Sequence, residues 1–283
     1  MTTGTDGSAR LELESVRFLT QAQRQALIQA NGKSAVTVVT ANGLRVRIPA
    51  GTLTDESQVD GLLADMTGAK AGDIVIRTDE QGKRHVVPLA LVSDGKAVYV
   101  AAGTGRYSLE RGSTSFADTE SHWARSSIAF SAARELTRGM SENLFDPERP
   151  ATRAMVFTLL ARLEGAELPD SQGAWYDSAV TWAMGKGLTD GDLPVEDVKR
   201  QELATLLWRW AGKPEASGEL TGFTDLWAVA PYAREPLAWA VEAGVLTGRT
   251  DASLDPTGPA TRAETAVMLE RFITYLVKEQ TGA

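Results

Sequence analysis

Three arginines occupy the same place in a pattern that recurs along the second half of this chain: Arg153, Arg200 and Arg262. Each is expected at the first position of a helix, where the positive end of the helix dipole disfavours a cation by about 0.3–1 kcal/mol. A cation placed there three times indicates an anion opposite it. That anion is either a ligand carboxylate, held by the guanidinium and by free helix N–H groups, or a neighbouring Asp or Glu of the protein.

Acidic side chains accompany two of these arginines. Glu202 and Glu264 each follow an arginine by two residues, and Thr261 with Glu264 has the spacing of a capping box. In that motif each side chain accepts a hydrogen bond from a backbone N–H at the helix start. We therefore expect Glu202 and Glu264 to act as helix caps or as ligand contacts.

Aromatic residues open an earlier helix in each copy of the pattern: Trp123, Trp175 and Tyr232. At helical spacing they fit a buried core, and alternatively they offer a flat apolar platform to a sugar ring. Asp118 and Asp225 precede two of these helices and fit turn or N-cap positions, with ligand contact as the alternative. A glycine follows each aromatic by sixteen residues and is expected to adopt positive φ: Gly139, Gly191 and Gly248.

The arginines belong to an internal repeat. Residues 145–154 and 254–263 are identical at seven of ten positions, and three blocks align without gaps: Trp123–Gly139, Trp175–Gly191 and Tyr232–Gly248. Each copy predicts a helix, a loop that contains glycine, and a second helix. One such pair cannot bury its own apolar face, so we expect three pairs packed about a pseudo-threefold axis.

The copies differ in their loops and signatures. Copy one has Met155 where the other two have glutamate. In copy two the step from Gly191 to Arg200 is nine residues, against fourteen in the other copies, and Asp-Pro is missing. The three copies are therefore not equivalent in sequence, and a role of one copy need not hold for all three.

The first part of the chain is predicted to be β-rich. Short runs rich in Val and Ile predict strands over five segments: 35–40, 44–48, 73–77, 85–92 and 97–101. Asn42-Gly43 and Asp94-Gly95 predict hairpin turns. Segments 21–30 and 58–66 are expected to be helical, and the Gly/Ser-rich segment 103–115 is expected to be a linker.

Composition excludes several function classes. The 283 residues include no Cys and only His85 and His122, which argues against thiolate or histidine metal sites and against Cys or Ser-His-Asp catalysis. The net charge of −8 argues against nucleic-acid binding, and the apolar runs are too short to span a membrane. Residues 1–112 carry 13 basic and 12 acidic side chains, whereas residues 113–283 carry 16 and 25. This asymmetry predicts two parts with different roles.

The repeated unit resembles the S-layer homology domain family. The resemblance rests on Phe116-Ala-Asp118 and Phe223-Thr-Asp225 at the openings, and on the Thr-Arg-Ala-Glu-like signatures at 152–155, 199–202 and 261–264. It implies three tandem repeats that bind secondary cell-wall polysaccharides, typically bearing pyruvate ketals, in grooves between repeats. Family membership also implies a binding module without catalytic activity.

Together these observations predict an α+β chain. A β-rich module over residues 1–112 precedes repeats over 113–168, 169–215 and 216–283. We expect non-covalent anchoring of a surface protein to the cell wall through an anionic glycan, without catalysis, cofactor, metal, nucleic acid or membrane insertion. The alternative is a repeat scaffold that binds another protein or self-associates.

The predicted location is extracellular, at the cell wall or S-layer. The N-terminal sequence does not have the pattern of a signal peptide. We therefore expect the chain to be a fragment of a longer secreted protein.

Overall fold

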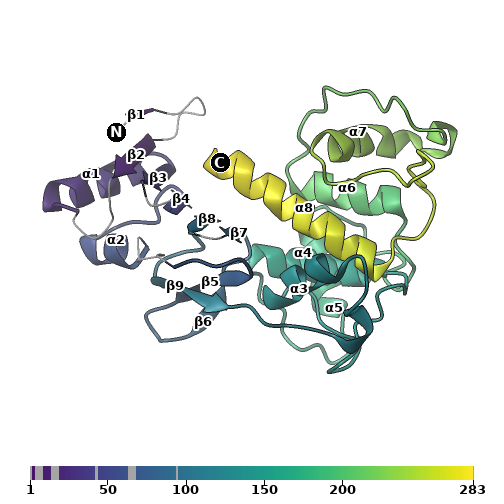
Figure 1. Cartoon of the computed structure of the whole chain (residues 1–283), viewed down its shortest axis with the longest axis horizontal. Helices are drawn as coiled ribbons and strands as arrows, with labels where there is room; N and C mark the ends of the chain where they lie inside the picture. Colours follow the sequence, from purple (N-terminus) through teal and green to yellow (C-terminus); the bar gives the residue numbers. More distant parts are fainter. Residues whose placement is uncertain are drawn as a thin grey trace. The chain divides into compact units, whose positions relative to one another are not determined.

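The structure is a computed structural model of an α+β chain that describes residues 2–3, 9–13, 19–41, 44–62, 68–93 and 95–282 (Figure 1). The chain divides into two compact units. Unit 1 comprises residues 1–113 with 276–283, and unit 2 comprises residues 114–275. The described part of unit 1 before residue 114 is rich in strands, and unit 2 is helical, as predicted.

The described residues of unit 1 form two sheets. The larger one has the strand order β1-β2-β3-β4-β8-β7, and the smaller one has the order β6-β5-β9. The strands are β1 (Thr2–Thr3), β2 (Ala9–Leu13), β3 (Val36–Thr40), β4 (Leu44–Ile48), β5 (Asp73–Thr78), β6 (Arg84–Val86), β7 (Ala90–Ser93), β8 (Lys96–Val100) and β9 (Arg106–Arg111). Two helices accompany them: α1 (Gln21–Asn31) and α2 (Glu56–Leu62).

Alternation explains how these strands build a core. In β4 the apolar residues Leu44, Val46 and Ile48 are buried, whereas Arg45 and Arg47 between them are more exposed. Successive side chains of a strand point to opposite faces of the sheet, so one face of β4 packs inward. The core continues through the other buried apolar side chains of this unit.

Two predictions for unit 1 are wrong. The segment 85–92 is not one strand, because β6 ends at Val86 and β7 begins at Ala90 in the other sheet. Pro88 lies between them and has no N–H to donate to a ladder. The segment 103–115 is not merely a linker, since β9 pairs with β5 over its whole length.

The other predicted strands and the first predicted helix are confirmed within one residue at each end. The second predicted helix begins two residues earlier, at Glu56, and is described to Leu62; residues 63–67 lie outside the described part. Asn42, Gly43 and Asp94 of the predicted turns also lie outside it. The strands that flank both turns pair antiparallel.

Residues 114–275, all of which the structure describes, contain three pairs of α-helices, the last of which continues beyond them. They are α3 (Arg125–Ala133) with α4 (Arg153–Glu164), α5 (Asp177–Gly185) with α6 (Arg200–Trp210), and α7 (Arg234–Glu242) with α8 (Arg262–Thr281). Three short 3-10 helices accompany them: η1 (Ala117–Thr119), η2 (Leu226–Ala228) and η3 (Pro231–Ala233). Each second helix begins at the predicted arginine.

The segments that precede the second helices are joined in a closed ring of backbone hydrogen bonds. The N–H of Ala151 donates to the carbonyl of Ala260 at 2.9 Å, that of Val198 to Ala151 at 2.8 Å, and that of Ala260 to Val198 at 2.8 Å. All three residues are buried. The ring therefore brings the starts of α4, α6 and α8 together although they are far apart in sequence.

No helix among the described residues is both long and apolar enough to cross a membrane. Nor does the described part contain a cluster of three or more His, Asp or Glu side chains arranged to hold a metal ion.

Candidate functional site

The ring creates three contacts, which we call junctions, where one second helix starts against the loop and second helix of another pair. Junction 1 brings Arg262 to Met155, junction 2 brings Arg153 to Glu202, and junction 3 brings Arg200 to Glu264. The arginine of one copy thus meets the third helical residue of the next copy. The three arginines and two glutamates are the residues predicted as ligand contacts, whereas Met155 was not among them.

Backbone N–H groups at the starts of these helices are already satisfied by protein carbonyls. At junction 1 the N–H groups of Arg262 and Ala263 donate to the carbonyls of Arg149 and Pro147, both at 2.9 Å. The first two N–H groups of α4 and α6 donate in the same way. The expectation that free helix N–H groups would hold an anion is therefore wrong at these positions, and a ligand must be held by side chains.

Two of the arginine side chains make the same pair of contacts. Arg262 donates from Nε to the carbonyl of Phe145 at 2.8 Å and from Nη2 to that of Arg138 at 2.8 Å. Arg200 donates from Nε to the carbonyl of Leu254 at 2.8 Å and from Nη2 to that of Thr247 at 3.3 Å. Both side chains are buried, so these bonds tie each guanidinium to the loop beside it.

The third nitrogen of the guanidinium distinguishes junction 1 from junction 3. Nη1 of Arg200 lies 3.1 Å from a carboxylate oxygen of Glu264, which also lies 3.3 Å from Arg249. Nη1 of Arg262 instead lies 3.7 Å from the sulfur of Met155, a weak acceptor. The positive charge of Arg200 is therefore neutralised inside the protein, whereas no carboxylate contacts Arg262 within this fully described unit.

Burial lowers the pKa of the Arg262 guanidinium from its ordinary value, and the nearby carboxylates of Asp146 and Asp118 oppose that shift. The ordinary value is so high that Arg262 stays cationic at neutral pH. The guanidinium of Arg262 also makes a cation–π contact, because its carbon lies 4.2 Å from the centre of the Phe145 ring.

Arg153 at junction 2 is held more loosely. Its Nη1 lies 3.8 Å from Glu202 and its Nη2 lies 3.4 Å from the hydroxyl of Thr189. Its Nε is buried without a hydrogen-bond partner among the described residues. The shorter loop of copy two explains this, because five residues are missing where the other copies supply the carbonyl that accepts from Nε.

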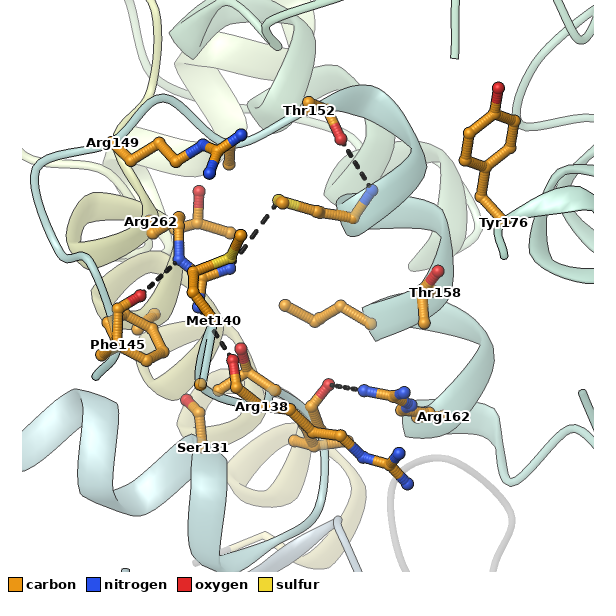
Figure 2. A pocket seen from close by; sticks show the side chains of 18 of the residues that line it. Ser131, Arg138, Met140, Phe145, Arg149, Thr152, Thr158, Arg162, Tyr176 and Arg262 are labelled. Carbon is orange, nitrogen blue, oxygen red and sulfur yellow. Dashed lines mark hydrogen bonds between the residues drawn. The ribbon is translucent and has the colours of Figure 1, made fainter. Parts of the chain in front are cut away.

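A pocket of about 580 Å³ opens at junction 1. Figure 2 shows four arginines around it: Arg138, Arg149, Arg162 and Arg262. Within the fully described unit 2, no Asp or Glu is among the residues that line this pocket. Arg138 and Arg149 form no ion pair with any described residue. The pocket is therefore an electropositive cavity in an otherwise acidic part of the chain, and it fits an anionic group.

The aromatic residues at the starts of the first helices are exposed. The exposed fractions are 64% for Trp123, 63% for Trp175 and 52% for Tyr232, so the expectation that they are core residues is wrong. Trp175 lines the junction 1 pocket. An exposed indole beside an electropositive cavity can pack on the apolar face of a sugar whose acidic substituent enters the cavity.

The predicted aspartates have structural roles. Asp118 accepts from the backbone N–H groups of Phe145 and Asp146, and Asp225 accepts from those of Leu254 and Asp255. Burial raises the pKa of Asp118, but these backbone donors outweigh it and hold the pKa below its ordinary value. The turn interpretation therefore describes both residues, and neither lines the junction 1 pocket.

The glutamates confirm the capping role, and each also faces an arginine of the protein. Glu264 accepts from the N–H of Thr261 while Thr261 accepts from the N–H of Glu264, which confirms the capping box. Glu202 accepts from the N–H of Lys199 in the same manner. Each also faces an arginine across its junction, so in this structure the anion opposite Arg200 is a protein side chain.

Two of the three repeated glycines differ from expectation. Gly191 has positive φ, but Gly139 and Gly248 do not. A Cβ on Gly139 or Gly248 would lie too close to the ring of Phe116 or Phe223 and to loop carbonyls. Close packing, and not a left-handed backbone, therefore excludes a side chain at those two positions.

Three further arginines recur at one helical position that the sequence interpretation did not use: Arg162, Arg209 and Arg271. Each lies nine residues after the first arginine of its helix and hydrogen-bonds to the segment that follows the first helix of its own copy. The repeat register alone could have found them. Arg138 and Arg149 are found in copy one only, so the register gives no signal for them.

Two stretches of the chain, residues 115–154 and 222–266, match the family described as S-layer homology domain. This confirms the resemblance for most of copy one. In copy three it confirms the resemblance from residue 222 to the start of the second helix. Residues 155–221, which include copy two, lie between the matched stretches.

Curated relatives extend over more of the chain. It is 28% identical to an exoglucanase XynX of Acetivibrio thermocellus over 215 residues, which are 68% of this chain and 20% of the relative. It is 27% identical to an amylopullulanase of Thermoanaerobacterium thermosulfurigenes over 207 residues, 67% of this chain and 11% of the relative. It is 28% identical to a surface-layer 125 kDa protein of Lysinibacillus sphaericus over 168 residues, 54% of this chain and 14% of the relative. The chain thus spans a fifth or less of the length of these relatives.

Proposed function

We propose that this chain anchors a surface protein to the bacterial cell wall by binding an anionic wall polysaccharide at junction 1. The observation that carries the proposal is the junction 1 pocket, which has four arginines, no acidic lining residue and an exposed Trp175 at its rim. Residues 113–283 have a net charge of −9, so a polyanion is repelled at long range and needs a local positive site. The matches to S-layer homology domains and to a surface-layer protein support the same function.

The ligand we propose is a secondary cell-wall polysaccharide that carries pyruvate ketals. A ketal places one carboxylate on an otherwise neutral sugar ring. The carboxylate can accept charge-assisted hydrogen bonds from guanidinium groups, and the sugar ring can pack on the indole of Trp175. These are the two kinds of group that line the pocket.

We further propose that the three helix pairs are three S-layer homology repeats packed about a pseudo-threefold axis. The closed ring of hydrogen bonds through Ala151, Val198 and Ala260 supports this arrangement, because each copy both donates to one neighbour and accepts from the other. A truncation after Gly212 removes the third copy and opens the ring. We expect such a fragment to lose the sharp thermal transition of the full chain.

The chain itself is proposed to bind without catalysis. The enzymes among its relatives match it over 20% of their length or less, which supports a shared module and not a shared reaction. Incubation with purified wall material should therefore release no reducing ends.

A sedimentation assay with purified cell-wall sacculi tests the proposed function. The chain should cosediment with intact sacculi and stay in the supernatant after hydrofluoric acid has removed the attached polysaccharide. Binding should be lost again when chemical removal of the ketals leaves the glycan backbone intact. Retention on stripped sacculi would contradict the proposal and would favour peptidoglycan, or a protein partner for the exposed aromatic residues.

A further inference from the structure

We infer that the third residue of each second helix decides whether its junction accepts an external anion, so that Met155 makes junction 1 the one open site of the three junctions. Glu202 and Glu264 place the protein's own carboxylate where a ligand's acidic group would bind. The inference rests on the proposed function only in naming junction 1 as the ligand site. It adds a specificity-determining residue and a stoichiometry of one anionic group per chain.

Arg200 and Arg262 are held alike but meet different partners at one nitrogen. Both guanidinium groups use Nε and Nη2 on equivalent loop carbonyls, so the protein holds them in the same frame. In junction 3 the remaining nitrogen meets Glu264, and in junction 1 it meets the thioether of Met155. A thioether carries no charge, so no protein carboxylate contacts Arg262 in this fully described unit, and a ligand carboxylate can take that place.

The surrounding positions reinforce the difference. Two arginines of the junction 1 pocket, at 138 and 149, align with Asp190 and Glu196 in copy two and with Thr247 and Gly258 in copy three. Junction 2 is therefore acidic where junction 1 is basic. An external anion is attracted to junction 1, is repelled from junction 2, and competes with Glu264 for Arg200 at junction 3.

A buried hydroxyl adds a second observation at the same place. Ser131 lines the junction 1 pocket, and its Oγ is buried with no hydrogen-bond partner among the described residues. Buried polar groups without partners are rare in folded proteins. A bound anion with several acceptor oxygens fits a pocket that holds this unused donor together with the arginines.

The test uses inorganic phosphate as a defined anionic probe and compares Met155→Glu with Met155→Gln. The two substitutions introduce side chains of nearly the same shape that differ in charge. Phosphate should raise the melting temperature of the wild-type chain at constant ionic strength, because a ligand that binds the native state stabilises it. Met155→Glu should bind phosphate about 10- to 150-fold more weakly, whereas Met155→Gln should stay within about threefold of wild type.

The complementary variant is Glu264→Met, which gives junction 3 the side chain of junction 1. Calorimetric titration with phosphate should give a stoichiometry of one for wild type and two for Glu264→Met. Melting in the absence of phosphate shows whether each variant is folded. Equal phosphate affinity of Met155→Glu and wild type, no phosphate binding by wild type, or a stoichiometry that stays at one in Glu264→Met would each overturn the inference.

Sacculus sedimentation of the same variants separates this inference from the proposed function. If wild type binds phosphate at junction 1 but does not bind sacculi, the proposed function fails and the inference stands. If wild type and Met155→Glu bind sacculi equally well, the inference fails and wall anchoring stands. Loss of sacculus binding in Met155→Glu alone supports both.

Discussion

Junctions 1 and 3 show how two copies of one sequence pattern can place different groups opposite the same arginine. Residues 145–154 and 254–263 are identical at seven of ten positions, and their loops hold Arg262 and Arg200 through equivalent carbonyl oxygens. At the third helical position Met155 stands in junction 1 and Glu264 in junction 3, and charges at loop positions differ as well. The first junction keeps an electropositive pocket and the other closes on an internal ion pair. The same repeated arginine thus pairs with a protein carboxylate in one junction and faces an uncharged thioether in the other.

The largest expected effect separates the two arginines by stability. Arg200→Ala should lower the free energy of unfolding by about 3–5 kcal/mol, because it leaves Glu264 facing a partly buried site without its closest partner. Arg262→Ala should lower it by about 1–3 kcal/mol, since it orphans loop carbonyls but no carboxylate. Urea unfolding of both variants measures the difference.

A loss below 0.5 kcal/mol in both variants would contradict this view of the two junctions. If Arg262 served only to bind a ligand, Arg262→Ala would weaken glycan binding and leave the melting temperature unchanged. The two buried bonds from Arg262 to the carbonyls of Phe145 and Arg138 make that expectation untenable. Binding measurements on this variant therefore need correction for the fraction that is folded.

A smaller effect is expected from the exposed tryptophans. Trp175→Ala should weaken glycan binding by about 2- to 12-fold, the equivalent of about 0.5–1.5 kcal/mol of ring contact. Trp123→Ala is the matched control, because Trp123 is equally exposed and occupies the same position in copy one. Both should leave the free energy of unfolding within about 0.5 kcal/mol of wild type. Equal losses of binding in the two variants would remove the distinction between junctions.

The smallest effect concerns acid. The pKa of Asp118 is lower in the folded chain than in the unfolded chain, so its carboxylate stabilises the fold above its unfolded pKa, near 4, and that stabilisation is lost as the pH falls through the folded pKa. Asp118→Asn removes this titration. Each acid-unfolding curve is followed by circular dichroism and expressed relative to the stability of the same protein at neutral pH. On that scale the midpoint of Asp118→Asn should lie at lower pH than the midpoint of wild type. An unchanged dependence on pH would contradict the role assigned to Asp118.

Repetition made most of the helical unit predictable. Seven identical residues in two loops and three aligned blocks located every second helix and its first arginine, because a repeated sequence must satisfy the same local hydrogen bonds in each copy. The strand β4 was equally predictable. Its apolar and arginine residues alternate, so all of its apolar side chains lie on one face of the sheet and are buried together. Capping by Thr261 and Glu264 also followed from spacing alone.

What the sequence could not supply were contacts between copies. Nothing local shows that Nε of Arg262 reaches the carbonyl of Phe145, which is 117 residues away. Arg138 and Arg149 were not recognised as pocket residues, because the other copies have no arginine at the equivalent positions. The strand β9 was missed because its turn-forming neighbours Gly103 and Gly105 made the whole segment resemble a linker.

The most direct test of the central claim is titration of two arginine variants with the polysaccharide released from purified cell walls. Arg149 lines the junction 1 pocket without an ion pair to a described residue, and Arg249 lies at junction 3, paired with Asp255 and Glu264. Both are exposed, so neither substitution by alanine should unfold the chain. Arg149→Ala should weaken binding by about tenfold or more, and Arg249→Ala should bind like wild type. Wild-type affinity in Arg149→Ala, or an equal loss in both variants, would contradict a single anionic-glycan site at junction 1.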